Sequence, residues 1–159
     1  MNAEVGIGYE VTIDRVFAAP RELVFDCMTR SEHLARWWGP HHFDVPFAES
    51  EARPGGKLRI AMRGPEPYGT NEVEGEFEVV ERPERLVMVL RAFGAPDGSW
   101  GIEHRTSMEF TDAAGGGTHM HMTTTVLQAS EELLPALAGM REGWSQSFEK
   151  LEALLPGLV

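Results

Sequence analysis

GMREGWSQSFEKLEALL, from Gly139 to Leu155, carries one long apolar stripe and constrains the fold of everything before it. Its apolar residues recur every three or four positions, the spacing of one helix face; they are Met140, Trp144, Phe148, Leu151 and Leu155. We expect a helix from about Met140 to Leu155 that packs this stripe against a sheet. Upstream, Ser130 is a candidate N-cap, while Pro135 and Gly139 indicate that SEELLPALAG is a shorter piece or a kinked entry.

The chain before this segment alternates short apolar runs with turns rich in Gly and Pro. The runs predict six strands: FDVPF (43–47), KLRIAMR (57–63), VEGEFEVVE (73–81), RLVMVLRAF (85–93), HRTSMEFTD (104–112) and THMHMTTTV (118–126). Because the connections are short, the strands should pair as antiparallel hairpins. EVTIDRVFA (10–18) predicts an earlier strand, and two short helices follow it, in PRELVFDCMT (20–29) and in SEHLARWW (31–38), where Ser31 is a plausible N-cap.

Two hairpins allow a register to be predicted. Both registers place large side chains on one face of the sheet. Across ERPE and AAGGG, the expected opposite pairs are Val79 with Leu86, Phe77 with Met88, Phe110 with Thr118, and Met108 with Met120. The order of elements therefore predicts an α+β fold, a curved antiparallel sheet that grips the C-terminal helix.

Five pieces of the sequence, in this order, resemble a known family. They are AAPRELVFDCMT with SEHLARWWGP, RPGGKLRIAMRG, EGEFEVVERPERLVMVL, GGGTHMHMT and GMREGWSQSFEKLEALL. The chain looks like a bacterial member of the family homologous to the C-terminal domain of the ninety-kilodalton heat-shock protein's ATPase activator, in the START-like (SRPBCC), helix-grip superfamily. The resemblance implies a seven-stranded antiparallel sheet around a long C-terminal helix, with two short helices after the first strand and a mostly apolar cavity.

The resemblance implies no particular reaction, because the superfamily includes lipid carriers, hormone receptors, polyketide cyclases and co-chaperones. The eukaryotic co-chaperone also carries an additional N-terminal domain that makes much of the chaperone contact. We expect the 159 residues to form one domain, 1–159, with residues 1–8 as a flexible N-terminus and no room for that second domain.

Composition limits the partners that this chain is expected to have. The net charge of -11 would repel a phosphate backbone or an anionic membrane surface, so we expect no nucleic-acid and no membrane partner. The single cysteine, Cys27, excludes an internal disulfide framework and suits a reducing cytoplasm. No basic, apolar leader and no run of about 18 apolar residues is present, so we expect a soluble cytoplasmic protein.

The six histidines raise the question of a metal or catalytic site. His119 and His121 should share the outer sheet face, with Glu109 opposite His119, which favours a cross-strand polar pair over a metal site. No nucleophile signature is present, and Cys27 on the apolar side of a short helix favours a core residue. We therefore predict no metal, no cofactor and no identified catalytic residue. Of the six, His42 and His104 are the ones that could face a cavity mouth.

Aromatic and methionine side chains are expected on the inward faces of sheet and helix. They either fill the core or line an adaptable apolar pocket, and the pattern fits both interpretations. The candidates for a pocket wall are Trp38, His42, Met62, Phe77, Met88, Trp100, Met108, Met120, Met122, Trp144 and Phe148. In RWWGPHHF, Arg36 to Phe43, the Gly-Pro pair should end the second helix, and at least one of Trp37 and Trp38 should anchor it to the sheet.

Three functions are compatible with these features. The first is a small cytoplasmic protein that binds an apolar or amphipathic molecule between sheet and helix. The second is an interaction module that docks on a chaperone, or on a second copy of itself as a homodimer, through an outer apolar patch at Val87 and Val89. The third is an enzyme of the cyclase or hydratase kind.

Overall fold

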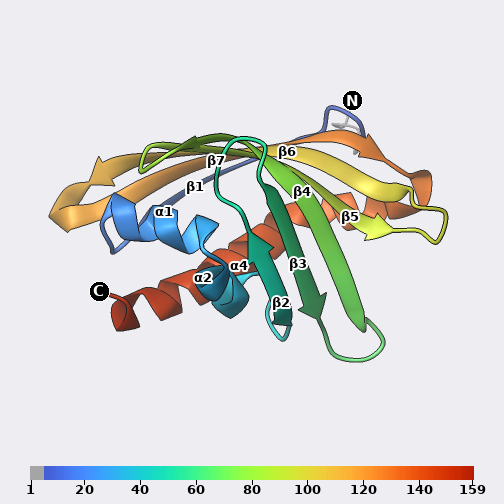
Figure 1. Cartoon of the computed structure of the whole chain (residues 1–159), viewed down its shortest axis with the longest axis horizontal. Coiled ribbons are helices and arrows are strands. Elements are labelled where there is room, and N and C mark those ends of the chain that lie inside the picture. The colour runs from blue at the N-terminus through green and yellow to red at the C-terminus, as the bar shows by residue number, and fades with distance from the viewer. Residues whose placement is uncertain (1–5) are drawn as a thin grey trace.

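A computed structural model describes residues 6–159 (Figure 1). The strands are β1 (Glu10–Phe17), β2 (Asp44–Ser50), β3 (Lys57–Arg63), β4 (Thr70–Glu81), β5 (Arg85–Gly94), β6 (Trp100–Ala113) and β7 (Gly117–Ala129). The helices are α1 (Arg21–Thr29), α2 (Ser31–Trp37), α3 (Leu134–Ala138) and α4 (Met140–Leu154), with short 3-10 turns at Ala114–Gly116, Glu131–Leu133 and Leu155–Gly157. The predicted strands and helices are therefore confirmed. Residues 1–5, part of the predicted flexible N-terminus, lie outside the described residues.

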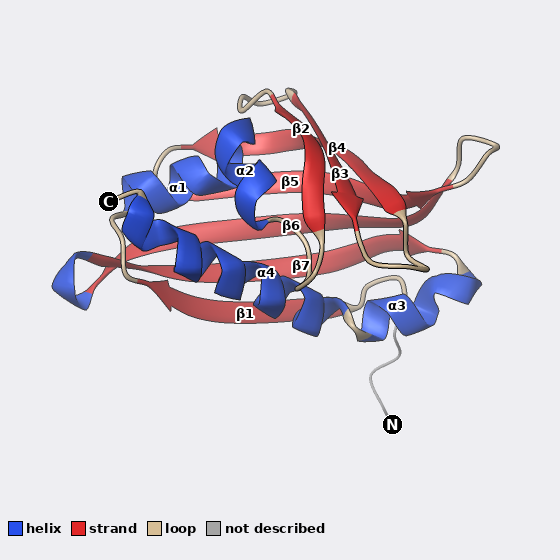
Figure 2. Cartoon of the chain, turned by 90° about the horizontal axis from the view of Figure 1, so that it is seen from below, coloured by secondary structure: helices blue, strands red, loops and turns tan. Residues whose placement is uncertain are grey.

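One antiparallel sheet carries all these strands in the order β1-β7-β6-β5-β4-β3-β2. Figure 2 shows α4 lying across one face of the sheet, with α1 and α2 beside it on the same face. The short connection after α2, residues 38–43, leads into β2 and β3, which run at a steep angle to β1 and β7 (Figure 1). The α+β helix-grip architecture predicted from the sequence is confirmed. None of the helices in residues 6–159 is long and apolar enough to cross a membrane.

The core lies between the sheet and the apolar stripe of α4. The inward residues of β1, Val11, Ile13 and Phe17, are buried, as their alternation predicts. Trp37 is completely buried, and its Nε1 donates to the Cys27 carbonyl oxygen at 2.9 Å. Its ring lies 6.0 Å from that of Phe148 on α4. Trp37 is thus the residue that anchors α2, with both its apolar ring and its N–H satisfied.

The predicted β6–β7 register was wrong by two residues. Met108 lies opposite Met122, and Phe110 lies opposite Met120. The loop is centred on Gly115, because Gly115 and Gly116 have φ of 73° and 78° and so supply the left-handed backbone that this turn needs. A register shift of two residues leaves every side chain on the same face of the sheet. The methionines that were predicted to point inward therefore do point inward.

The β4–β5 register is partly as predicted. Phe77 lies opposite Met88, but Val79 lies opposite Val87 and not opposite Leu86. The register shifts between Phe77 and Val79, so Glu78 is the extra residue of a β-bulge. Such a bulge is set by the strand's surroundings and has no clear mark in the local sequence.

Two predicted helix caps also differ. Ser31 is the first residue of α2, and Arg30 occupies the N-cap position without a side-chain cap. Ser130 does occupy the N-cap position of the turn at Glu131–Leu133, as predicted, but its hydroxyl donates to the Gly101 carbonyl oxygen at 3.4 Å and makes no cap hydrogen bond. Neither element therefore begins with a side-chain cap hydrogen bond.

The apolar patch predicted at Val87 and Val89 on the outer sheet face is not exposed, while docking on a chaperone or a second copy stays a prediction. Val87 and Val89 point outward but are only 5% and 9% exposed. Val89 lies between Glu76 on β4 and Arg105 on β6, and an ion pair joins Arg105 to Glu78 at 2.6 Å. The aliphatic stems of such long side chains cover apolar surface while their charged ends stay in water. The middle of the outer face is therefore ionic.

Candidate functional site

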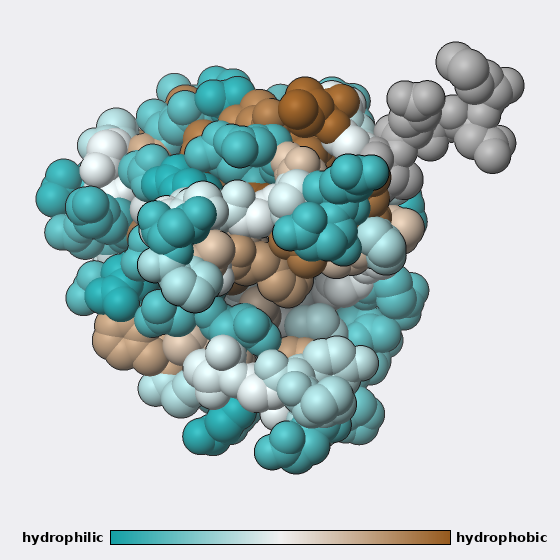
Figure 3. Space-filling view, turned by 90° about the vertical axis from the view of Figure 1, so that its right-hand side faces the viewer, coloured by the Kyte–Doolittle hydropathy of each residue, from teal (hydrophilic) through white to brown (hydrophobic). Residues whose placement is uncertain are grey.

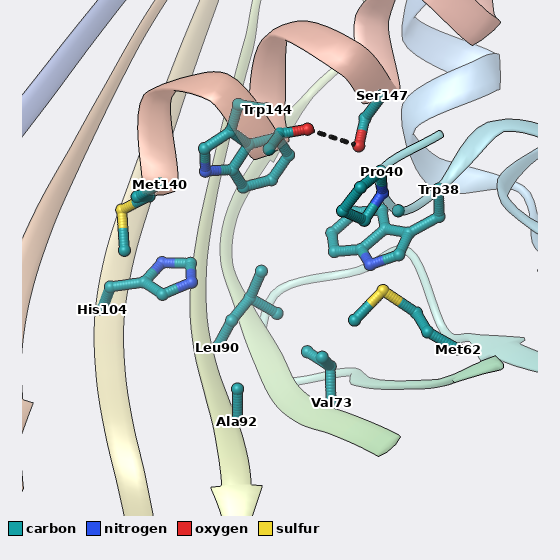
Figure 4. Close-up of a pocket in the computed structure, with 12 residues that line it drawn as sticks. Trp38, Pro40, Met62, Val73, Leu90, Ala92, His104, Met140, Trp144 and Ser147 are labelled. Atoms are coloured by element: carbon teal, nitrogen blue, oxygen red, sulfur yellow. Dashed lines mark hydrogen bonds between the residues drawn. The ribbon is translucent and has the colours of Figure 1, made fainter. Parts of the chain in front are cut away.

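A cavity of about 170 Å³ lies between the sheet and the first half of α4 (Figure 4). Its walls come from three parts of the chain. The sheet supplies Met62, Val73, Leu90, Ala92 and His104, α4 supplies Met140, Gly143, Trp144 and Ser147, and the turn after α2 supplies Trp38, Gly39 and Pro40. Figure 3 views this end of the molecule and shows apolar atoms inside a hollow that is rimmed by hydrophilic residues.

The helical wall follows directly from the spacing of α4. Met140, Gly143, Trp144 and Ser147 occupy positions i, i+3, i+4 and i+7, so one side of the helix presents all of them. A Cβ at Gly143 would meet no atom within 4 Å, so the absence of a side chain leaves space beside Trp144. Trp144 stacks on Phe148 with ring centroids 5.6 Å apart and meets Trp38 edge-on at 5.4 Å. The aromatic rings thus close the cavity toward the core.

Lys150 fixes the wall formed by the turn after α2. Its Nζ donates to the carbonyl oxygens of Trp38 and Gly39, both at 3.2 Å, and of Phe43, at 3.1 Å. Desolvation by burial lowers the pKa of this ammonium. Beside it, the His41 backbone N–H donates to Gln146 Oε1 at 3.1 Å. The end of α2 therefore finds its cap on α4, and the Gly-Pro turn is tied to the helix that it faces.

His104 is the one ionisable side chain among the residues that line the cavity. Its Nδ1 lies 2.9 Å from Thr106 Oγ1, which lies 2.8 Å from Thr124 Oγ1. Burial of the imidazole lowers the pKa of His104 to about 4, so the ring is neutral at neutral pH. The Ser147 hydroxyl donates to the Gly143 carbonyl oxygen at 3.0 Å (Figure 4). The cavity therefore combines apolar walls with one neutral imidazole.

The structure divides the predicted pocket residues into three groups. Trp38, Met62 and Trp144 line the cavity. His42 is exposed and outside it, and Trp100 borders a separate surface groove with Phe93. The remaining candidates belong to the closed core, each at most 2% exposed: Phe77, Met88, Met108, Met120, Met122 and Phe148. Most of the predicted methionine wall is thus core packing.

His104 was predicted at a cavity mouth, but its hydroxyl partners were not recognised in the sequence. The inward row of β6 reads Ile102, His104, Thr106, Met108 and Phe110. Two polar residues in an otherwise apolar, inward row need hydrogen-bond partners inside the protein. The pattern therefore predicts a buried polar group among the apolar side chains that face the helix. Gly143 and Ser147 could also have been found, since they lie three residues after Met140 and Trp144 of the predicted apolar stripe.

The outer histidines form a polar cluster, as predicted, but with another partner. His119 Nε2 and His121 Nδ1 lie 3.0 and 2.8 Å from Asp14 Oδ1 on β1. Glu109 lies opposite His121, so its predicted pairing with His119 was wrong. The hydrogen bond from His121 is the main cause that lowers the pKa of Asp14. Within residues 6–159, no three side chains of the metal-ligating types are grouped closely enough to hold a metal ion.

Cys27 is completely buried on α1, where desolvation raises its pKa to about 11. A thiol with such a pKa carries almost no thiolate at neutral pH, and thiolate is the nucleophilic form. This environment agrees with the predicted core role of Cys27.

Solved structures share this fold over nearly the whole chain. A protein from Nitrosomonas europaea superposes with a TM-score of 0.76 and 23% identity, covering 99% of this chain and 97% of its own. An AHSA1 protein from Silicibacter pomeroyi gives 0.77 and 20%, covering 95% and 100%. A protein from Arthrobacter aurescens gives 0.80 and 22%, covering 93% and 86%. At such identities the likeness concerns the fold alone.

A search of curated proteins found no match. Among protein families, residues 18–156 match the family described as "Activator of Hsp90 ATPase homolog 1-like protein". That match spans most of the chain and includes all five pieces on which the resemblance was based. The chain therefore belongs to the Activator of Hsp90 ATPase homolog 1-like family.

Proposed function

We propose that this protein is a cytoplasmic binding protein for a small apolar molecule, which it holds in the cavity between the sheet and α4. The observation that carries this proposal is the cavity of about 170 Å³ beside Trp38, Trp144 and Met62. An apolar cavity of about 150 Å³ is large enough to take a benzene ring. The ligand is therefore of the size of a substituted benzene.

The way in which the cavity is built supports binding over a packing defect. Its polar atoms are few and are held in fixed positions, and the neighbouring core is closed around fully buried methionines. A pocket with apolar walls and a small number of placed polar groups is the usual form of a small-molecule site. The ionic outer face around Val89 gives no comparable support for chaperone docking.

The test uses calorimetric titration and two-dimensional NMR with isopropylbenzene as the probe. We expect saturable binding with shifts confined to the amides of β3 to β6, of α4 and of the turn after α2. In Gly143→Leu the new side chain should occupy the cavity and abolish binding, while the melting temperature is retained or raised, because the site has room and leucine favours the helix.

Gly157→Leu is the matched control. Gly157 also has open space around its Cβ position and no left-handed backbone, but it lies beyond the end of α4 and does not line the cavity. It should bind the probe as the parent does. Absence of binding by the parent protein, or equal binding by parent and Gly143→Leu, would refute the proposed function.

A further inference from the structure

The hydroxyl groups behind His104 determine which of its ring nitrogens carries the proton. Thr106 and Thr124 are both completely buried, so their hydroxyl protons need acceptors inside the protein. In the described part of the chain, Thr124 Oγ1 makes one hydrogen bond, to Thr106 Oγ1 at 2.8 Å. A donor at Thr124 that pointed elsewhere would be left unsatisfied. Thr124 therefore donates to Thr106.

The rest of the relay follows from this direction. Thr106 Oγ1 accepts from Thr124, so its own proton is free to be donated to His104 Nδ1, 2.9 Å away. The reverse direction, with Nδ1–H donating to Thr106 and Thr106 to Thr124, would leave the Thr124 proton without an acceptor. Nδ1 is thus the acceptor, and a neutral imidazole then carries its proton on Nε2.

The Nε2 atom faces the cavity. Figure 4 shows the imidazole reaching from β6 into the space between Trp144 and Leu90. Nε2 has no hydrogen-bond partner among residues 6–159, yet it is not among the fully enclosed polar atoms that lack one. It is therefore open to the cavity. Its N–H is held in one tautomer by the two threonines, and the indole N–H groups of Trp38 and Trp144 are further neutral donors in the same wall.

The charge of the surroundings restricts the ligand further. None of the cavity-lining residues is a lysine or an arginine. Lys150, the nearest ammonium group along α4, is directed to the carbonyl oxygens of the turn after α2. A carboxylate or phosphate in the cavity would lose its hydration without gaining a counter-charge, which is costly. The neutral N–H group of His104 is therefore matched by a neutral hydrogen-bond acceptor on the ligand.

We infer that the ligand is a neutral, benzene-sized molecule with a hydrogen-bond acceptor, such as a ketone or aldehyde oxygen, that accepts from Nε2–H of His104. This inference rests on the proposed function and specifies its ligand class. His104, Thr106 and Thr124 together act as the polar recognition element: the threonines position the proton, and the imidazole presents it to the ligand.

The test compares three probes of equal non-hydrogen size: isopropylbenzene, acetophenone and benzoate. Their affinities for the parent protein, for His104→Phe and for Thr106→Val are measured by calorimetry. For each protein, the readout is the ratio of its affinity for acetophenone to its affinity for isopropylbenzene. This ratio should be about five- to tenfold higher in the parent than in either variant, which is the contribution of one neutral hydrogen bond. Benzoate should bind more weakly than both. Thr111→Val, an exposed position on β6, is the matched control and should leave the ratio unchanged.

A second readout does not depend on any ligand. Long-range ¹⁵N–¹H correlation spectra of histidine-labelled protein at neutral pH should show His104 as the Nε2–H tautomer, and Thr106→Val should shift it toward the Nδ1–H form. Observation of the Nδ1–H tautomer in the parent would overturn the inference, whatever the probes do.

The two proposals fail in different ways. If isopropylbenzene binds but acetophenone gains nothing from His104, the cavity is a binding site and the assigned ligand class is wrong. Preferential binding of benzoate would likewise exclude a neutral ligand. If none of the probes binds, the proposed function fails, and the ligand class that rests on it fails too.

Discussion

His104 should make the stability of the protein depend on pH in a defined window. Its pKa is lowered from 6.5 to about 4 by burial, so the unfolded chain binds a proton more readily than the folded one. Stability is therefore complete above pH 6.5 and is lost as the pH falls toward 4. The loss in the free energy of unfolding should approach about 3 kcal/mol.

Urea unfolding of the parent and of His104→Phe between pH 7 and 4 checks this prediction. The readout is the slope of stability against pH, since the substitution also changes stability at neutral pH. The slope between pH 6.5 and 4 should be much smaller in His104→Phe. Equal slopes would show that His104 is not the group responsible.

The adjacent tryptophans of RWWGPHHF are expected to differ in importance. Trp37 is completely buried and donates to Cys27, whereas Trp38 borders the cavity and is 7% exposed. Trp37→Ala should lower the free energy of unfolding by about 3–5 kcal/mol, and Trp38→Ala by less, because part of its surroundings is already empty space. His41→Ala, at an exposed residue, should stay within about 0.5 kcal/mol of the parent. A lower melting temperature for Trp38→Ala than for Trp37→Ala would contradict this assignment.

At the scale of single elements, Lys150 links α4 to the end of α2. Lys150→Met keeps the aliphatic stem but removes the donor to the carbonyl oxygens of Trp38, Gly39 and Phe43. We expect a loss of about 1–3 kcal/mol in the free energy of unfolding and faster amide exchange at residues 39–43. Lys57→Met is the control, because Lys57 is the other of the chain's two lysines and is exposed. Equal exchange in the two variants would refute the role of Lys150.

Element positions could be predicted from the sequence, but exact pairings could not. The period of α4 and the alternation of β1 gave both elements and their buried faces. The bulge at Glu78 depends on contacts with the neighbouring strands, and the turn centred on Gly115 depends on backbone torsion angles. The spacing of hydrophobic residues carries no information about either feature.

At the scale of the whole molecule, ionic side chains cover the middle of the outer sheet face. Val87 and Val89 were expected to form a docking patch, yet both are nearly buried: Val87 lies between Val79 and Ser107, and Val89 lies between Glu76 and Arg105. Val87→Asp should therefore behave as a core substitution and lower the free energy of unfolding by about 2–4 kcal/mol, because it places an unpaired carboxylate in a covered position.

Val16→Asp provides the comparison, since Val16 is 60% exposed on the edge strand β1. That variant should unfold within about 0.5 kcal/mol of the parent in urea. Similar small effects at both valines would mean that Val87 is accessible and would restore the docking patch.

The cavity itself was only partly predictable at this scale. Trp38, Met62 and Trp144 were identified, but the same rule also selected Met88, Met108, Met120 and Met122, which the sheet and helix enclose completely. Whether an inward side chain fills space or borders it depends on how far apart sheet and helix are held. Where space remains, the turn after α2 forms a further wall, and its attachment to Lys150 joins segments far apart in the sequence, so no local pattern describes it.

The arrangement of Trp38 and Trp144 also has an optical consequence. Their indole rings lie 5.4 Å apart at an interplanar angle of 75°, and Trp37 lies 5.6 Å from Trp38 at 48°. Chromophores this close and this skewed share their excited states, so the three indoles should give an exciton couplet in circular dichroism. Because two of them border the cavity, a ligand that tilts either ring would alter the couplet. Ligand binding could then be followed by circular dichroism without a label.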